Sequence, residues 1–214
     1  MNEIPSRTVR FDAAFAALPL VAILRGITPA QAQSVGEALY EAGFRLIEVP
    51  LNSPDPFDSI SRLRNVLPAD ALVGAGTVLQ SSQIGSLVSA GGEWVVMPHA
   101  DLALIRAAKV AGLPCVPGVA TPTEAFAAIA AGADALKLFP AELLRPPVIK
   151  AMRAVLPQST RLLPVGGITP ENMPDYIVAG ADGFGLGSAL YSADTSAAQV
   201  QRRAQRFVAA WRSK

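Results

Sequence analysis

The chain has 214 residues, 51% of them hydrophobic and 16% charged, with 18 lysines and arginines against 17 acidic residues and one cysteine, Cys115. This length suffices for one buried core, and the near-zero net charge without a long basic run excludes the electrostatic footprint of a nucleic-acid or anionic-membrane binder. One cysteine cannot form an internal disulfide, and the first apolar run, Leu18–Leu24, is far shorter than the roughly 20 residues of a membrane span, so we expect a cytoplasmic enzyme acting on small molecules.

A helix over Arg7–Leu18 is the first predicted element, and short apolar runs follow it along the rest of the chain. The later runs come after helix-stop signals such as Ala42-Gly43 or Val66-Leu67-Pro68, which recur at intervals of roughly 20–25 residues. An apolar run without polar alternation is typical of a buried parallel strand. We therefore predict strands at Leu20–Arg25, Phe44–Leu51, Ala71–Gly76, Trp94–Pro98, Leu113–Gly118, Ala135–Phe139, Arg161–Gly166 and Asp182–Gly187.

Hydroxyl residues, most of them followed by proline, open the helical patterns between these strands. The hydroxyl can cap the first turn, and proline there needs no hydrogen-bond donor. The predicted starts are Thr28-Pro29, Ser53-Pro54, Ser81-Ser82, Thr121-Pro122 and Thr169-Pro170. Eight strands alternating with helices predict an α/β fold with a parallel sheet, and eight regular units close more compactly as a (β/α)8 TIM barrel than as an open doubly wound sheet. We expect a single barrel domain over residues 1–214, with the extra N-terminal helix against the barrel's N-terminal end.

Four polar residues interrupt or end the apolar strands: Arg25, Glu48, Thr77 and Lys137. The active site of such a barrel lies at the carboxyl ends of the strands, so these residues are candidates for function. Lys137 has apolar neighbours on both sides, and burial would lower the pKa of its amine. A neutral amine can condense with a ketone, and the protonated imine then accepts the electrons of a breaking carbon–carbon bond. The alternative for Lys137 is a side chain that reaches solvent or pairs with a structural acid.

Glu48 provides a second group that this chemistry needs, one that moves protons. It lies in the apolar segment Leu46–Val49, where an unpaired carboxylate is costly, and a structural ion pair with Arg25 is the alternative. Arg25 can also bind a substrate carboxylate through its forked guanidinium. Thr77 offers a hydroxyl either to the substrate or to a turn.

Glycine-rich segments after the last two predicted strands indicate a phosphate site, because these two loops commonly bind phosphate in barrels. Gly166 and Gly167 follow the seventh strand, and Gly187 and Ser188 follow the eighth. Glycine lets backbone N–H groups approach the oxygens, and a short helix beginning near Ser188 would direct its N-terminus at the anion. Tight turns are the alternative explanation for any one of these glycines.

Neither a metal nor a cofactor is expected. His99 is the single histidine, and without a carboxylate cluster it makes a poor metal site. A Ser-His-Asp triad would have to use the same residue, and the sequence contains no nucleophile elbow. His99 either lines the pocket or has no special role.

Five motifs resemble those of one enzyme family across about residues 19–191: Ala22–Ile27, Ile47–Pro54, Gly74–Leu79, Ala135–Pro140 and Val165–Gly167. In them the chain is similar to the class I aldolases of bacterial sugar-acid catabolism, which cleave 2-keto-3-deoxy-6-phospho-sugar acids. The resemblance implies a lyase without metal or cofactor, acting on a phosphorylated keto acid and assembled as a homotrimer.

The same resemblance assigns roles to the candidate residues. It implies that Lys137 forms the Schiff base, that Glu48 is the acid/base, and that Arg25 and Thr77 bind the keto-acid end. The residues implied for the phosphate are Gly166, Gly167, Gly187 and Ser188.

Two branches of this family differ in the configuration of their substrate at C4. Members acting on the gluconate-derived substrate usually carry an arginine where this chain has Asn52 and a threonine where it has Val165. The chain therefore resembles the galactonate branch, with the gluconate-derived epimer as the alternative substrate. Losing a hydroxyl at Val165 removes a hydrogen-bonding option in the site, and discrimination between epimers can depend on such a group.

Fold and phosphate loops alone do not select a chemistry, so two rivals stay open. One is a phosphate-binding isomerase or synthase on the same barrel, which would not need Lys137. The other is a metabolite-binding barrel without catalytic activity.

Overall fold

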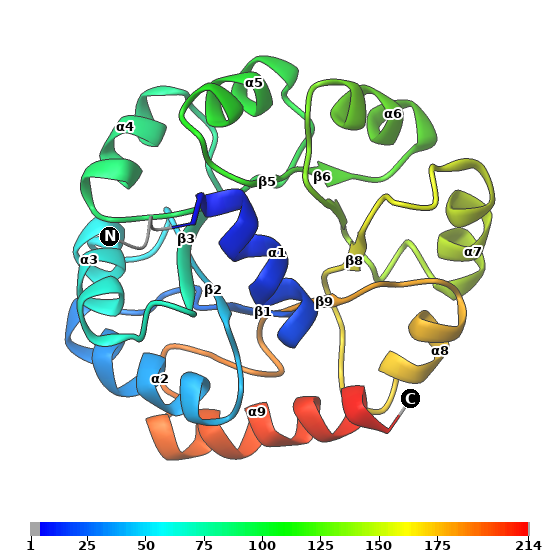
Figure 1. The fold of residues 1–214 in the computed structure, drawn as a ribbon. Helices are drawn as coiled ribbons and strands as arrows, with labels where there is room; N and C mark the ends of the chain where they lie inside the picture. Colours follow the sequence, from blue (N-terminus) through cyan, green and yellow to red (C-terminus); the bar gives the residue numbers. More distant parts are fainter. Residues whose placement is uncertain (1–4, 214) are drawn as a thin grey trace.

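The computed structural model describes residues 5–213. Within them, every strand pairing is parallel, and helices surround the strands (Figure 1). The strands are β1 (Leu20–Ile23), β2 (Leu46–Pro50), β3 (Leu72–Gly76), β4 (Val95–Val96), β5 (Cys115–Val116), β6 (Gly118–Val119), β7 (Leu136–Leu138), β8 (Leu162–Pro164) and β9 (Phe184–Leu186). The helices are α1 (Arg7–Ala17), α2 (Pro29–Glu41), α3 (Pro56–Val66), α4 (Ser82–Ser89), α5 (Leu102–Val110), α6 (Pro122–Ala130), α7 (Pro146–Val155), α8 (Met173–Val178) and α9 (Ala197–Arg212).

The strands form two sheets around one centre. Six strands pair in the order β5-β4-β3-β2-β1-β9, and three pair in the order β6-β7-β8. The break between β5 and β6 falls at Pro117, which has no N–H to donate, so the predicted fifth strand is two short pieces. On the other side, an isolated parallel bridge joins Val165, after β8, to Gly185 in β9. The predicted α/β fold with parallel strands and an extra N-terminal helix is confirmed.

Three of the predicted helix starts are correct. Thr28 and Thr121 open α2 and α6 with capping boxes, in which the threonine and a Gln or Glu three residues later satisfy each other's backbone N–H groups. Ser81 directly precedes α4. The hydroxyl residues predict these helix starts correctly because capping involves only residues within one helical turn.

Two predicted starts are wrong. Ser53 is buried, and its hydroxyl accepts a hydrogen bond from the Gly26 N–H at 3.0 Å, so α3 begins only at Pro56. Thr169 does not cap α8 either. The Asn172 side chain accepts a hydrogen bond from the Thr169 N–H at 2.9 Å, and α8 begins at Met173, the residue after Asn172. Both hydroxyl residues thus stabilise loops rather than helix ends.

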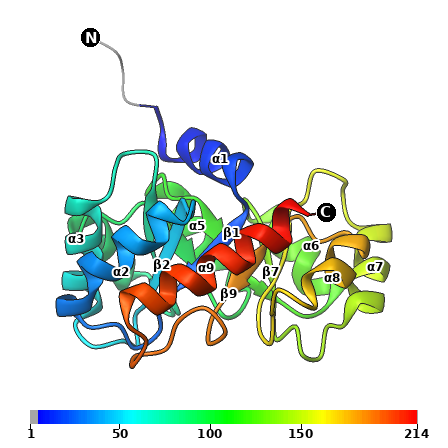
Figure 2. The same cartoon turned by 90° about the horizontal axis from the view of Figure 1, so that it is seen from below.

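Helix α1 covers the amino ends of the strands (Figure 2). Phe11 and Phe15 on its inner face belong to one buried cluster with side chains of β1, β2 and β3, and the ring centroids of Phe11 and Trp94 lie 5.7 Å apart. Arg10 of α1 and Arg64 of α3 both form ion pairs with Glu93, the latter at 2.8 Å. This end of the strand ring is therefore sealed, and a ligand can enter only at the carboxyl ends.

Among residues 5–213, no helix has both the length and the apolar character needed to cross a membrane.

Candidate active site

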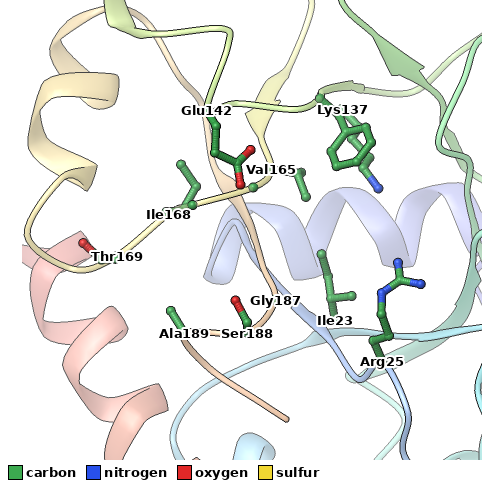
Figure 3. A pocket seen from close by; sticks show the side chains of 13 residues that line it. Ile23, Arg25, Lys137, Glu142, Val165, Ile168, Thr169, Gly187, Ser188 and Ala189 are labelled. Carbon is green, nitrogen blue, oxygen red and sulfur yellow. The ribbon is translucent and has the colours of Figure 1, made fainter.

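A pocket of about 380 Å³ opens at the carboxyl ends of the strands (Figure 3). Its walls come from the ends of β1, β7, β8 and β9 and from the loops after them. The lining residues are Ile23, Arg25, Lys137, Phe139, Glu142, Val165, Gly166, Gly167, Ile168, Thr169, Gly187, Ser188 and Ala189. Seven of the nine predicted site residues are among them, and Glu48 and Thr77 lie just outside this wall.

Lys137 lies at the centre of β7, and its side chain reaches the floor of the pocket. The residue is 6% exposed, and among the described residues its Nζ forms no ion pair or hydrogen bond. Nζ lies 4.6 Å from the centroid of the Phe139 ring, two residues further along the same face. Burial lowers the pKa of the Lys137 amine; the Glu48 carboxylate opposes this, and Arg25 adds to the lowering. Lys137 is therefore neither an exposed surface lysine nor part of an ion pair among the described residues.

Glu48 lies at the centre of β2 and is 1% exposed. Its Oε2 atom is fully buried and forms no hydrogen bond within the described residues. Burial raises the pKa of Glu48 to about 7, against the opposing effects of the positive charges of Lys137 and Arg25. The carboxylate extends over Gly76 of β3, where a Cβ atom would come within 1.8 Å of Oε2, so the glycine creates the space for it.

Arg25 forms no ion pair with Glu48 within the described residues, so the structural alternative for Glu48 is wrong. Arg25 Nη1 donates to Asn52 Oδ1 at 2.7 Å, and its Nη2 donates to Thr77 Oγ1 at 3.4 Å. Thr77 has a φ of 55°, an uncommon left-handed conformation for threonine that turns the chain at the end of β3. The guanidinium is exposed at the mouth of the pocket, held by two neutral groups and available to a carboxylate.

Unpaired backbone donors gather at the other end of the pocket. Gly166 and Gly167 both have positive φ values, 111° and 62°, which glycine adopts without strain. Within the described part of the chain, the N–H groups of Gly167, Ile168, Ser188 and Ala189 donate no hydrogen bond. Free N–H groups on two loops that line one pocket are suited to bind an anion such as phosphate.

The short helix expected near Ser188 is absent. A single turn takes its place, closed by bonds from the N–H groups of Leu190 and Tyr191 to the carbonyl of Gly187, both at 2.9 Å. The chain then turns again through Thr195, whose Oγ1 accepts from the Ser192 N–H at 3.2 Å, before α9 begins. One turn still leaves the N–H groups of Ser188 and Ala189 without a hydrogen bond in the described structure.

His99 is exposed and lines neither this pocket nor the smaller cavity below it. In residues 5–213 there is no cluster of three or more His, Cys, Asp or Glu side chains that could hold a metal.

Phe139 and Glu142 line the pocket and were not predicted as site residues from the sequence. Phe139 could have been found, because it lies two residues after Lys137 and so shares its face of the strand. Glu142 gave no such signal, because it lies in a loop. Asn52 was identified only as a position where the two branches differ, and its bond to Arg25 appears only in the structure. Glu142 carries a carboxylate into the pocket wall, so close to Gly166 that a Cβ there would lie 2.2 Å from Glu142 Oε2.

Comparison with known proteins agrees with this geometry. Residues 11–205 match the family model "KDPG and KHG aldolase". A probable 2-dehydro-3-deoxy-6-phosphogalactonate aldolase of Rhizobium meliloti (strain 1021) is 50% identical over 193 residues, which cover 90% of this chain and 91% of the relative. The 2-dehydro-3-deoxy-6-phosphogalactonate aldolase of Escherichia coli (strain K12) is 46% identical, over 91% of this chain and 95% of that one.

A solved structure described as native KDPGal superimposes with a TM-score of 0.90 at 46% identity, covering 92% of this chain and 95% of that chain. The family model and both relatives extend over nearly the whole chain, including the strands that carry Glu48 and Lys137. The protein therefore belongs to the KDPG and KHG aldolase family and is an aldolase, that is, a lyase.

Proposed function

We propose that the protein is a class I aldolase that reversibly cleaves 2-dehydro-3-deoxy-6-phosphogalactonate to pyruvate and D-glyceraldehyde 3-phosphate. The observation that carries this proposal is the buried amine of Lys137, which forms no ion pair within the described residues and lies at the floor of an open pocket. The names of the two relatives support the substrate.

In the proposed reaction, the neutral amine of Lys137 adds to the C2 ketone to form a carbinolamine, which loses water to give a protonated imine. A base removes the proton of the C4 hydroxyl, the C3–C4 bond breaks, and its electrons move into the imine to give an enamine. Glyceraldehyde 3-phosphate leaves. The enamine is protonated at C3, and hydrolysis of the resulting imine releases pyruvate and restores the amine.

Glu48 is the proposed acid and base, relaying protons through a water. A pKa near 7 allows it to give and take protons at neutral pH, as the alternating steps require. The imine serves as the electron sink, so the proposed mechanism needs no cofactor.

The ends of the pocket match the two charged ends of the proposed substrate. Arg25 and Thr77 would bind the carboxylate beside C2, and the loops that contain Gly166, Gly167, Gly187 and Ser188 would bind the phosphate on C6, with the free N–H groups of Gly167 and Ser188 as donors. Val165, at the wall between them, would face the middle of the sugar chain, where the epimers differ.

Reductive trapping tests the proposal. Treatment with pyruvate and borohydride should attach one reduced pyruvate to Lys137, and peptide mapping can assign it because the chain has only four lysines. Lys137→Met should abolish the adduct and the cleavage activity. Lys109→Met is the matched control, because the Lys109 Nζ is bound to Asp134 at 2.6 Å outside the pocket; it should be labelled like the natural protein. An unlabelled natural protein would favour an isomerase or synthase.

We also infer that the two sheets act as one closed barrel of a single domain over residues 1–214. The one-residue break at Pro117 and the bridge from Val165 to Gly185 support closure. A homotrimer is proposed from the family resemblance, and the exposed apolar side chains near α6 and α7 support a subunit contact there. A cytoplasmic location is proposed because the substrate of the proposed reaction is a charged phosphate ester.

A further inference from the structure

A smaller cavity of about 10 Å³, which we call the inner cavity, lies beneath the pocket inside the strand ring. Ile23, Lys137 and Val165 line both spaces and therefore form the partition between them. Apart from Lys137, the polar side chains that line the inner cavity are Glu48 and Trp94, and the rest of its wall is apolar.

Glu48 and Trp94 each bring an unpartnered polar atom to this cavity. Trp94 is fully buried and Glu48 is 1% exposed. Within the described residues, neither Trp94 Nε1 nor Glu48 Oε2 forms a hydrogen bond. Buried donors and acceptors without a partner are rare in proteins, and here an unpaired donor and an unpaired acceptor line the same cavity.

Trp94 Nε1 and Glu48 Oε2 both lie against strand β3, which gives an indication of the distance between them. A Cβ on Gly74 would lie 2.6 Å from Trp94 Nε1, and a Cβ on Gly76 would lie 1.8 Å from Glu48 Oε2. Residues two apart on a strand share one face and are separated by about 7 Å. Both polar atoms therefore lie over neighbouring points of one strand, with no direct bond between them.

The size and polarity of the inner cavity match a single water. A volume of about 10 Å³ is that of one water sphere, and a buried water typically has about three polar partners. We propose that the inner cavity binds one water, which accepts a hydrogen bond from Trp94 Nε1 and donates one to Glu48 Oε2, with Lys137 Nζ as its third partner. Trp94 is thereby a positioning residue for Glu48; this role rests on the proposed function of Glu48 as the acid and base.

The water would affect the ionisation of Glu48. The charged groups that act on this carboxylate are Lys137 from β7 and Arg25 from the end of β1, and both favour its ionised form against the effect of burial. A donor supplied by Trp94 through the water favours the ionised form as well. Removing that donor should therefore raise the pH at which Glu48 ionises.

The first test uses the natural protein. Trp94 and Trp211 are the only tryptophans, so ¹⁵N-labelled protein gives two indole N–H signals, and Trp211 serves as an internal reference. The Trp94 signal should move with pH, with a midpoint near that of Glu48, and this movement should disappear in Glu48→Gln. A crystal structure at high resolution should show one water between Nε1 and Oε2. A dry inner cavity or an indole signal that does not titrate overturns the proposal.

The second test is Trp94→Phe, which removes the N–H and keeps an aromatic ring against Phe11. The midpoint of the acidic limb of the kcat profile should rise by about 0.5–1 pH unit, while KM changes little. Phe11→Leu is the matched control, because it alters the packing against the same indole without removing the N–H. The midpoint of the acidic limb in this variant should equal that of the natural protein. Equal shifts in both variants would mean a packing effect and overturn the proposal.

Trapping with pyruvate separates this inference from the proposed function. Trp94→Phe should still form the Lys137 adduct. If the natural protein forms no adduct, the proposed function fails whatever the inner cavity contains; if the adduct forms and the cavity is dry, only the role of Trp94 fails.

Discussion

Lys137 and Glu48 are ionisable groups placed where their charged forms are disfavoured, and this shared property makes them suitable for imine chemistry. Burial is the main cause of both pKa shifts, and it acts in opposite senses on an amine and a carboxyl group. Burial thus shifts the pKa of each group toward its neutral form, to about 7 for Glu48 and downward for Lys137. Apolar wall residues such as Ile23 and Val165 maintain this environment.

The raised pKa of Glu48 predicts a stability effect that depends on pH. A carboxyl group whose pKa rises from 4.5 to about 7 on folding stabilises the native state less and less as pH increases through that window. Glu48→Gln stays neutral, so its free energy of unfolding relative to the natural protein should increase by about 3 kcal/mol between pH 4 and pH 8. Urea unfolding at both pH values measures this, and a difference that does not change with pH would contradict it.

Val165 is the residue proposed to distinguish between the two epimers at C4 of the substrate. It is 7% exposed in the pocket wall, where a threonine of nearly the same shape would offer a hydroxyl. Val165→Thr should shift the ratio of kcat/KM toward the gluconate-derived epimer, by roughly tenfold. Val178→Thr, at an exposed position of α8, is the control and should leave the ratio unchanged. An unchanged ratio for Val165→Thr would assign the discrimination to other residues, and a natural protein that prefers the gluconate form would overturn the branch assignment.

Helix α1 and the loops at the carboxyl ends of the strands lie at opposite ends of the strand ring and differ in polarity. The loops carry most of the polar groups of the pocket, whereas α1 closes the opposite end with apolar side chains and one ion-pair cluster. In that cluster, Glu93 is shared by Arg10 and Arg64, all three largely buried. Stability at one end is therefore separated from chemistry at the other.

This separation predicts that Glu93→Gln destabilises the fold without disabling the site. Removing the carboxylate leaves two arginines short of a partner in a largely buried place, so the free energy of unfolding should fall by about 2–3 kcal/mol. The yield of the Lys137 adduct should not change. Arg206→Gln breaks an exposed pair with Glu171 and should have little effect on either measurement. A loss of adduct in folded Glu93→Gln would show that the two ends are coupled.

The exposed apolar surface of the whole molecule is unevenly distributed. Leaving out Phe139, which lines the pocket, four of the nine large apolar side chains described as exposed lie between residues 126 and 155: Phe126, Leu143, Val148 and Val155. These residues are in or near α6 and α7, which are neighbours in the outer ring of helices (Figure 1). Grouped apolar residues on a surface are typical of subunit contacts.

The proposed trimer can be tested on this surface. Light scattering should give three times the mass of one chain, and Leu143→Asp should shift the protein toward monomers, because a charge would then be buried in the contact. Val110→Asp is the matched control, since Val110 is also highly exposed, at 91% against 75% for Leu143, but lies on α5; this variant should remain trimeric. A monomeric natural protein would contradict the proposal.

The sequence by itself determined the order of strands and helices, the parallel α/β fold, and Lys137 and Glu48 as polar residues in apolar strands. These properties depend on residues close together in the chain, where periodicity and helix caps act. Only the tertiary structure decided that Arg25 binds Asn52 instead of Glu48, that Ser53 supports a loop, and that Glu48 and Trp94 share a cavity. Such contacts join different strands, so they depend on register and on which positions are glycine, and a single sequence does not encode them as a local pattern.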